Sequence, residues 1–147
     1  MAVNGVYVVL GESNAVVALL KKARRHWHAS NDASLEDTDP LLRSFADLKE
    51  VLNEVADIMD MNPLTFLSPF LDVIRSQNTN GPITEAALSA VAKFLSYGLV
   101  DASSIKAAHT VESIAQAVTN TKFIGSASAG SDECVLFKIL HVLRALM

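Results

Sequence analysis

The stretch from Asn62 to Val100 constrains the fold most, because two apolar helical patterns are joined there by one polar turn. Its first half carries two adjacent apolar rows at helical spacing: Leu64, Leu67, Leu71 and Ile74, and Phe66, Phe70 and Val73. A helix that is apolar over most of its circumference must be buried. The second half repeats the pattern in Leu88, Val91, Leu95 and Leu99. The stretch therefore predicts a buried helical hairpin at the centre of the core.

Local signals predict where the two helices of this hairpin begin and end. Asn62 is a good helix cap, and Pro63 suits the first helical position because no amide donor is needed there. Pro69 lacks the amide that the preceding turn requires, so we expect the first helix to kink or restart there. Gly81 and the proline after it predict the turn, and Thr84 is the expected cap of the return helix.

Amphipathic stripes predict two helices before the hairpin. The first covers residues 7–28, although Gly11, Ser13 and Asn14 could divide it in two. Its apolar stripe consists of Val9, Val16, Leu20, Ala23 and Trp27. The second begins at Pro40 after an acidic loop. Its stripe consists of Phe45, Leu48, Leu52, Val55 and Met59.

Two further helices are predicted after the hairpin. The fifth is capped by Asp101 or Ser103 and has a weak apolar stripe. Its members are Ile105, Ala108, Val111, Ala115 and Val118. The sixth covers residues 131–147, is apolar nearly all round and runs to the last residue. Because such an end leaves apolar surface uncovered, we expect the natural polypeptide to continue, or this edge to meet another chain.

These elements together predict an all-α fold. The only short β-branched run, from Tyr7 to Leu10, leads into a helical pattern. Helix starts two elements apart recur near the roughly 40-residue period of armadillo and HEAT repeats, which predicts a stack of about six antiparallel helices. The sequence does not repeat itself at that period, so a compact helical bundle is the alternative.

Length and composition fit one domain over residues 1–147, with 50% hydrophobic residues to form its core. A net charge of −4 argues against a nucleic-acid partner, because such proteins carry a broad basic face. The single cysteine excludes an internal disulfide and suits a reducing compartment. No apolar run reaches the roughly 18 residues of a spanning helix. A cytoplasmic location is therefore expected.

Residues that usually carry catalytic or metal chemistry are scattered along this sequence. Cys134 lies in an apolar stretch without a neighbouring base, so it is expected to pack as a small hydrophobe. His26 and His28 are two residues apart, which places them on different faces of a helix. His109 and His141 each stand alone. We therefore expect no catalytic residue, no cofactor and no metal site.

A basic cluster ends the first predicted helix and admits two interpretations. Its members are Lys21, Lys22, Arg24, Arg25 and Trp27. Cations beside a tryptophan can hold a helix on an anionic membrane surface. The same cations also complement the negative end of the helix dipole as a solvated last turn, which is the interpretation we prefer. A helical adaptor that binds a membrane surface or other proteins is the corresponding alternative function.

Three segments carry a family resemblance. They are LLRSFADLKEVLN from Leu41, FLSPFLDVIRSQNTNGPITEAALSAVAKFLSYGLV from Phe66, and SDECVLFKILHVLRAL from Ser131. In this order they resemble the N-terminal dimerisation and cyclophilin-binding (DCB) region of the large Golgi Arf guanine-nucleotide exchange factors, the Golgi-specific brefeldin A-resistance subgroup in particular. The resemblance implies an armadillo-like region that dimerises and packs on the homology-upstream-of-catalytic segment of its parent protein. It also implies that the parent activates Arf GTPases on early Golgi membranes.

The resemblance also bears on two charges that interrupt apolar sequence, Lys93 and Glu133. From the residues alone, Lys93 would extend to solvent and Glu133 would complement a helix dipole. The matching positions in the Golgi exchange factors are associated with dimerisation, so the resemblance implies a homodimer interface through Lys93 and Glu133. The catalytic exchange domain is not among these residues, so Arf would be reached only through that domain of the parent.

Overall fold

The computed structural model describes residues 5–27, 39–76, 79, 81–100, 105–119, 142 and 144, with the backbone alone at 24–27 and 105–107. Five α-helices and one short 3-10 helix lie within these residues. They are α1 (Gly5–Trp27), α3 (Pro40–Glu54), η2 (Ile58–Asp60), α4 (Pro63–Arg75), α5 (Gly81–Ser96) and α6 (Ile105–Thr119). The described residues contain no strand, which confirms the all-α class. The predicted sixth helix lies outside them except for Val142 and Arg144, and both are helical.

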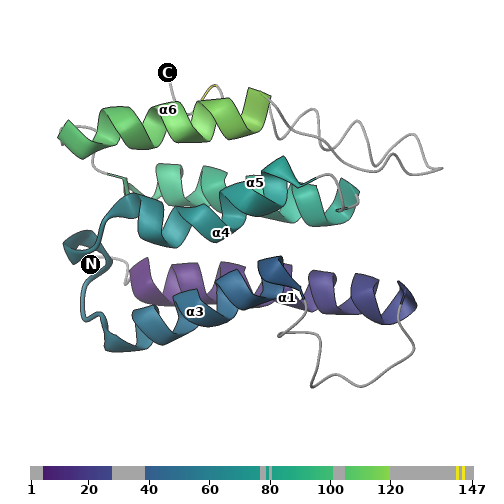
Figure 1. Ribbon diagram of the computed structural model, residues 1–147. Helices are drawn as coiled ribbons and strands as arrows, with labels where there is room; N and C mark the ends of the chain where they lie inside the picture. Colours follow the sequence, from purple (N-terminus) through teal and green to yellow (C-terminus); the bar gives the residue numbers. More distant parts are fainter. Residues whose placement is uncertain are drawn as a thin grey trace.

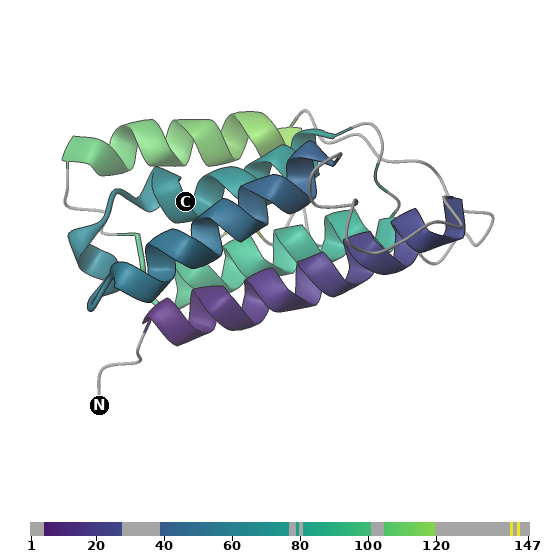
Figure 2. The same ribbon diagram turned by 60° about the horizontal axis from the view of Figure 1, so that its bottom comes forward.

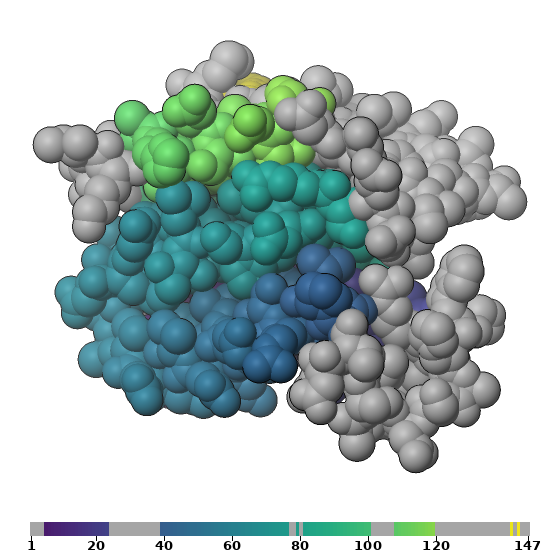
Figure 3. Space-filling model, viewed as in Figure 1, coloured from purple at the N-terminus to yellow at the C-terminus, as the bar shows by residue number. Residues whose placement is uncertain are grey.

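Successive helices run antiparallel and stack in layers (Figures 1 and 2). The first layer consists of α1 and α3, and the second of α4 and α5. Between these layers α1 packs on α5 and α3 packs on α4, while α6 lies against the far side of α4. The layering agrees with the predicted stack of antiparallel helices. Figure 3 shows the face of the molecule that α3, α4 and α6 form.

Four phenylalanine rings join the two layers. Phe45 of α3 meets Phe70 of α4 edge to face, with 5.1 Å between ring centroids. Phe94 of α5 meets Phe70 at 5.1 Å and Phe66 at 5.7 Å in the same geometry. Such pairs add about 0.5 to 1.5 kcal/mol each to the free energy of area burial. The predicted hairpin is thus the centre of the core, as its apolar rows indicated.

The first helix of the hairpin begins as predicted and runs on without a break. The Asn62 side-chain oxygen accepts a hydrogen bond from the Leu64 amide at 3.1 Å, and Pro63 occupies the first turn. α4 continues as one helix through Pro69, so no restart occurs there. The lost hydrogen bond is offset by burial, because Leu67, Phe70 and Leu71 around the proline are buried.

The return helix begins four residues earlier than predicted, at Gly81 instead of Glu85. α5 starts at Gly81, and Thr84 lies buried inside it instead of capping it. The Thr84 hydroxyl lies 3.1 Å from the hydroxyl of Thr79, within hydrogen-bond distance. Pro82 falls in the first turn, where a residue without an amide hydrogen is tolerated. The Gly-Pro pair is therefore the start of the helix and not the turn before it.

Two predicted features of the first layer differ in the structure. α1 is continuous, and the buried Ser13 hydroxyl donates to the carbonyl of Val9 at 2.7 Å, so the polar residue is accommodated within the helix. α3 ends at Glu54, and the apolar stripe does not extend to Met59, whose exposed fraction is 49%. The 3-10 turn η2 rotates the chain, so Ile58 is buried in place of Met59.

The buried face of α6 also differs from the predicted stripe. Ala108 is exposed, while Val111 and Ala115 are only partly buried. The buried residues are Thr110, Ile114, Ala117 and Val118. The helix is therefore rotated relative to the prediction, with a threonine on its inner face, because its alanines fit either side and give little periodic signal.

Candidate functional site

The seam between α1 and α5 contains the one predicted interface residue that the structure describes, Lys93. The two helices run antiparallel, with Gly5 close to Leu99 at one end and Glu12 opposite Lys93 further along (Figure 2). α5 ends at Ser96, and the turn after it contains Gly98, whose φ of 70° is left-handed and favours glycine. The Leu99 amide then donates to the Phe94 carbonyl at 3.0 Å, which turns Leu99 back into the core.

Lys93 forms an ion pair with Glu12 across this seam. The Lys93 ammonium donates to Oε1 of Glu12 at 2.6 Å. The lysine side chain is 51% exposed and the glutamate side chain is 18% exposed. The hydrogen bond and the charge of Glu12 raise the pKa of Lys93 above its ordinary value. Lys93 is therefore a fixed positive charge at the surface and already has a partner within its own chain.

Tyr97 lies beside Lys93 on the outer side of α5. Its amide donates to the Lys93 carbonyl at 2.9 Å, which continues the helical hydrogen bonding by one residue past Ser96 and places the two side chains on one face. Its side chain is among the exposed large apolar groups. We call the three residues Glu12, Lys93 and Tyr97 the α1–α5 patch. An exposed aromatic ring next to a held charge is the kind of surface found in protein interfaces.

The sequence pointed to Lys93 but not to its two neighbours in the α1–α5 patch. Glu12 lies 81 positions away from Lys93 in the sequence, so no local spacing relates the two. Tyr97 had a usable signal, since it stands four residues after the lysine at helical spacing. Glu133, the second predicted interface residue, lies outside the described residues.

Only part of the predicted membrane-contact cluster lies within the described residues. α1 reaches Trp27 as one helix, with Lys22 exposed and Lys21 partly buried. The side chains of Arg24, Arg25 and Trp27 lie outside the described residues. Among the described helices, none is long and apolar enough to cross a membrane. Nor do the described residues hold a group of three or more His, Cys, Asp or Glu that could bind a metal ion.

Comparison with known sequences relates the whole chain to one kind of protein. It is 76% identical over all 147 residues to a Golgi-specific brefeldin A-resistance guanine nucleotide exchange factor 1 homolog of Caenorhabditis elegans. The chain matches a segment shared by Arf guanine-nucleotide exchange factors. The ARF guanine-nucleotide exchange factor GNOM of Arabidopsis thaliana is 36% identical over 92% of the chain. ARF guanine-nucleotide exchange factor 2 of Saccharomyces cerevisiae is 31% identical over 74% of it.

The match is to a small part of each exchange factor. The chain spans 7% of the length of the C. elegans and yeast relatives and 9% of the length of GNOM. No family model matches the chain. The predicted family resemblance is confirmed, and the all-α segment described above is related to one region of these large exchange factors.

Proposed function

We propose that this chain is a self-association and regulatory module of a large Arf exchange factor in Golgi vesicle traffic, without catalytic activity of its own. The α1–α5 patch is the observation that carries the proposal. Lys93 is the only basic residue within α5 and lies at the surface beside the exposed ring of Tyr97. In a homodimer, Lys93 of one copy would meet Glu133 of the other.

An interface charge of this kind sets register and partner choice more than affinity. When one member of a desolvated pair is lost, the other is left without compensation, at a cost of about 2 to 5 kcal/mol. The intrachain ion pair gives Glu12 a defined role in this proposal. It holds the Lys93 ammonium in place before association, and it competes with the partner's carboxylate afterwards.

Light scattering coupled to size-exclusion chromatography tests the proposal. The wild-type chain should elute as a dimer at concentrations where Lys93→Ala combined with Glu133→Ala is monomeric, with unchanged helicity by circular dichroism. A matched control is Lys49→Ala combined with Glu50→Ala, which removes one exposed cation and one exposed anion from α3. If the double variant at 93 and 133 stays dimeric, the assignment is wrong, and the apolar face of residues 135–147 becomes the better candidate interface.

Glu12→Ala gives an opposite and more specific expectation. Removing the intrachain competitor should leave the dimer equally strong or stronger, because Lys93 is then available to the partner's carboxylate. A loss of association as large as that of the double variant would mean that the Glu12–Lys93 pair itself forms the contact surface.

The other partners that we propose are a segment of the parent exchange factor and the Arf GTPase. We propose that the module packs on the homology-upstream-of-catalytic segment of the same exchange factor, and that Arf is bound only by the exchange domain. The purified chain should then leave nucleotide release from an Arf GTPase unchanged. Acceleration of release by this chain alone would contradict the proposal.

The membrane interpretation is tested by flotation with anionic liposomes. Each exposed cation near an anionic surface contributes about 1 kcal/mol, so a short cluster without apolar insertion should bind weakly. On this proposal the location on early Golgi membranes is peripheral and depends on the parent protein. Tight flotation that is lost on charge reversal at Lys21 and Arg25 would favour the adaptor function instead.

A further inference from the structure

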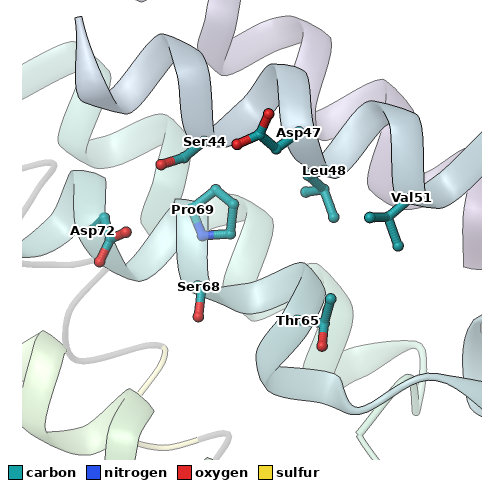
Figure 4. Close-up of a pocket in the computed structure, with 8 residues that line it drawn as sticks. All are labelled: Ser44, Asp47, Leu48, Val51, Thr65, Ser68, Pro69 and Asp72. Atoms are coloured by element: carbon teal, nitrogen blue, oxygen red, sulfur yellow. The ribbon is translucent and has the colours of Figure 1, made fainter.

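The second seam between the layers, where α3 crosses α4, contains a hollow on the opposite side of the molecule from the α1–α5 patch (Figures 1 and 4). Its volume is about 240 Å³. Eight residues line it: Ser44, Asp47, Leu48, Val51, Thr65, Ser68, Pro69 and Asp72. This volume is below the roughly 300 to 1,000 Å³ of small-molecule sites, so the hollow fits one or two side chains of a partner protein better than a whole ligand.

The two ends of the hollow differ in chemistry. Because α3 and α4 run antiparallel, Asp47 lies towards the Asp72 end, and Val51 lies near Thr65 (Figure 4). Leu48 and Pro69 are buried between the two ends and form an apolar floor. Val51 is 40% exposed, so part of its aliphatic side chain is accessible at this end. One end of the hollow is therefore acidic and the other aliphatic.

The acidic end is poorly neutralised within the described part of the chain. Asp72 has Arg75 at 3.6 Å, and both side chains extend well into solvent. Burial of the Asp72 carboxyl raises its pKa, and Arg75 lowers it by less. No described cation lies within ion-pairing distance of Asp47. A partner's cation at this end would gain attraction from Asp47 in particular, because the described residues provide no ion-pair partner for it.

Pro69 also changes the backbone hydrogen bonding of α4 beside the hollow. A proline has no amide hydrogen, so the carbonyl of Thr65, four residues earlier, loses its usual donor in the helix. Both residues line the hollow. Lysine and arginine side chains carry several donors and no acceptor, so they match the two carboxylates at the acidic end.

We propose that this hollow binds a partner protein helix that presents a lysine or arginine at the Asp47–Asp72 end and an aliphatic side chain at the Val51–Thr65 end. The spacing supports a helix, because Asp47 and Val51 are four residues apart, which is about 6 Å or one turn. A helical partner presents side chains at this distance from positions i and i+4. The charge complementarity and the spacing both come from α3 and α4 and do not depend on self-association through Lys93.

Selection of peptides tests this inference. A random library of helical peptides displayed on phage is selected against the immobilised wild-type chain, and enriched peptides are then measured in solution by fluorescence anisotropy. We expect enriched sequences to carry Lys or Arg four residues from Leu, Ile, Val or Met. If no sequence is enriched over the empty support, or if the enriched sequences lack the basic residue, the inference is wrong.

Three variants of the chain locate the binding. Asp47→Lys reverses the charge at the acidic end and should weaken the selected peptides by about tenfold or more, which corresponds to about 1.4 kcal/mol. Val51→Ser should weaken them several-fold by removing the aliphatic contact. Glu50→Lys is the matched control, since Glu50 is exposed on α3 but does not line the hollow, and it should bind as the wild type does.

Two outcomes with these variants would overturn the inference. Equal loss of binding in Asp47→Lys and Glu50→Lys would show a general charge effect instead of a site. A fall in self-association of the Asp47→Lys chain, measured by light scattering in the same samples, would assign the hollow to a second copy. Circular dichroism of each variant, with the wild-type spectrum expected, separates these outcomes from a loss of fold.

Discussion

The two seams between the helical layers share the same antiparallel packing but differ in the charges at their surfaces. At α1–α5, opposite charges face each other, and the Glu12–Lys93 pair bridges the surface of the seam. At α3–α4, the charges that rim the seam are both negative, and a hollow is left between the helices. The comparison teaches that the same antiparallel packing is compatible with a seam closed by an ion pair and with a seam that keeps two carboxylates beside a hollow. A partner's carboxylate can pair with Lys93 at the bridged seam only by replacing Glu12. At the open seam a partner can enter the hollow without displacing an ion pair between the two helices.

The largest effect should come from the layer that both seams share. Leu71 in α4 is 1% exposed, and Leu71→Ala should lower the free energy of unfolding by about 2 to 5 kcal/mol through cavity formation. From the sequence, Leu71 and Leu95 were both expected to be core residues, but Leu95 in α5 is only partly buried. Leu95→Ala should therefore cost less. Urea denaturation monitored by circular dichroism measures both changes, and equal losses would contradict the described packing of α5.

The next largest effect is expected at the end of the α1–α5 seam, where the backbone of α1 lies close to the side chains of Ile58 and Leu99. A Cβ atom on Gly5 would collide with Cγ2 of Ile58 and lie 2.8 Å from Cδ2 of Leu99. Gly5→Ala should therefore destabilise the chain by about 1 to 3 kcal/mol by overpacking. Thermal denaturation measures the change.

Gly11 provides the matched control on the same helix. A Cβ atom there meets nothing within 4 Å. Gly11→Ala should raise stability by about 0.5 to 1 kcal/mol, because alanine is the better helix former. If both substitutions had the same sign, the close approach of α1 to Leu99 and Ile58 would be wrong.

A smaller effect is expected from opening the bridged seam. Glu12→Gln removes the charge of the ion pair, and an exposed pair of this kind contributes about 0.2 to 1 kcal/mol. The wild-type advantage should shrink at high salt, because ions screen the attraction. Glu50→Gln serves as control, since no described cation pairs with Glu50. A salt-independent difference would point to a packing role for Glu12.

The smallest effect should come from the open seam. The pKa of Asp72 is raised above its ordinary value of 3.8, chiefly by burial, so the folded chain holds this proton more tightly than the unfolded chain. Ionisation of Asp72 therefore lowers stability as pH rises from 3.8 through the folded pKa. Asp72→Asn should add a few tenths of a kcal/mol at neutral pH, since half-exposed charges are screened. The gain should vanish near pH 3, and a gain that persists there would have another cause.

Strong periodicity explains which parts of this fold were predictable. The rows of large apolar residues in α4 admit one burial pattern, and the structure buries Phe66, Phe70 and Leu71 as predicted. In α6 the alanines are small enough for either face, so the predicted stripe was rotated from the buried face, although Val118 is buried as predicted. Met59 was misplaced because a 3-10 turn interrupts the period that the prediction extended.

The candidate site was predictable only where one residue stood out alone. Lys93 is the one cation within a largely apolar helix and interrupts its apolar second half, which made it visible in the sequence. Its pairing with Glu12 depends on the antiparallel contact of α1 and α5, and that contact involves no local spacing. The hollow likewise depends on which sides of α3 and α4 meet, so neither Asp47 nor Asp72 could be assigned to it from the sequence.

The chain of phenylalanine rings has a consequence for how this molecule unfolds. Stacked helical repeats can often open one layer at a time, because each layer contacts only its neighbours. Here Phe45 from the first layer meets Phe70 in the second, and Phe70 in turn meets Phe94. Opening either layer breaks the Phe45–Phe70 contact between them, so the backbone amides of α3, α4 and α5 should exchange with deuterated water at one common rate. The three helices that carry these rings then form a single cooperative unit, against which α6 can open at a lower free energy.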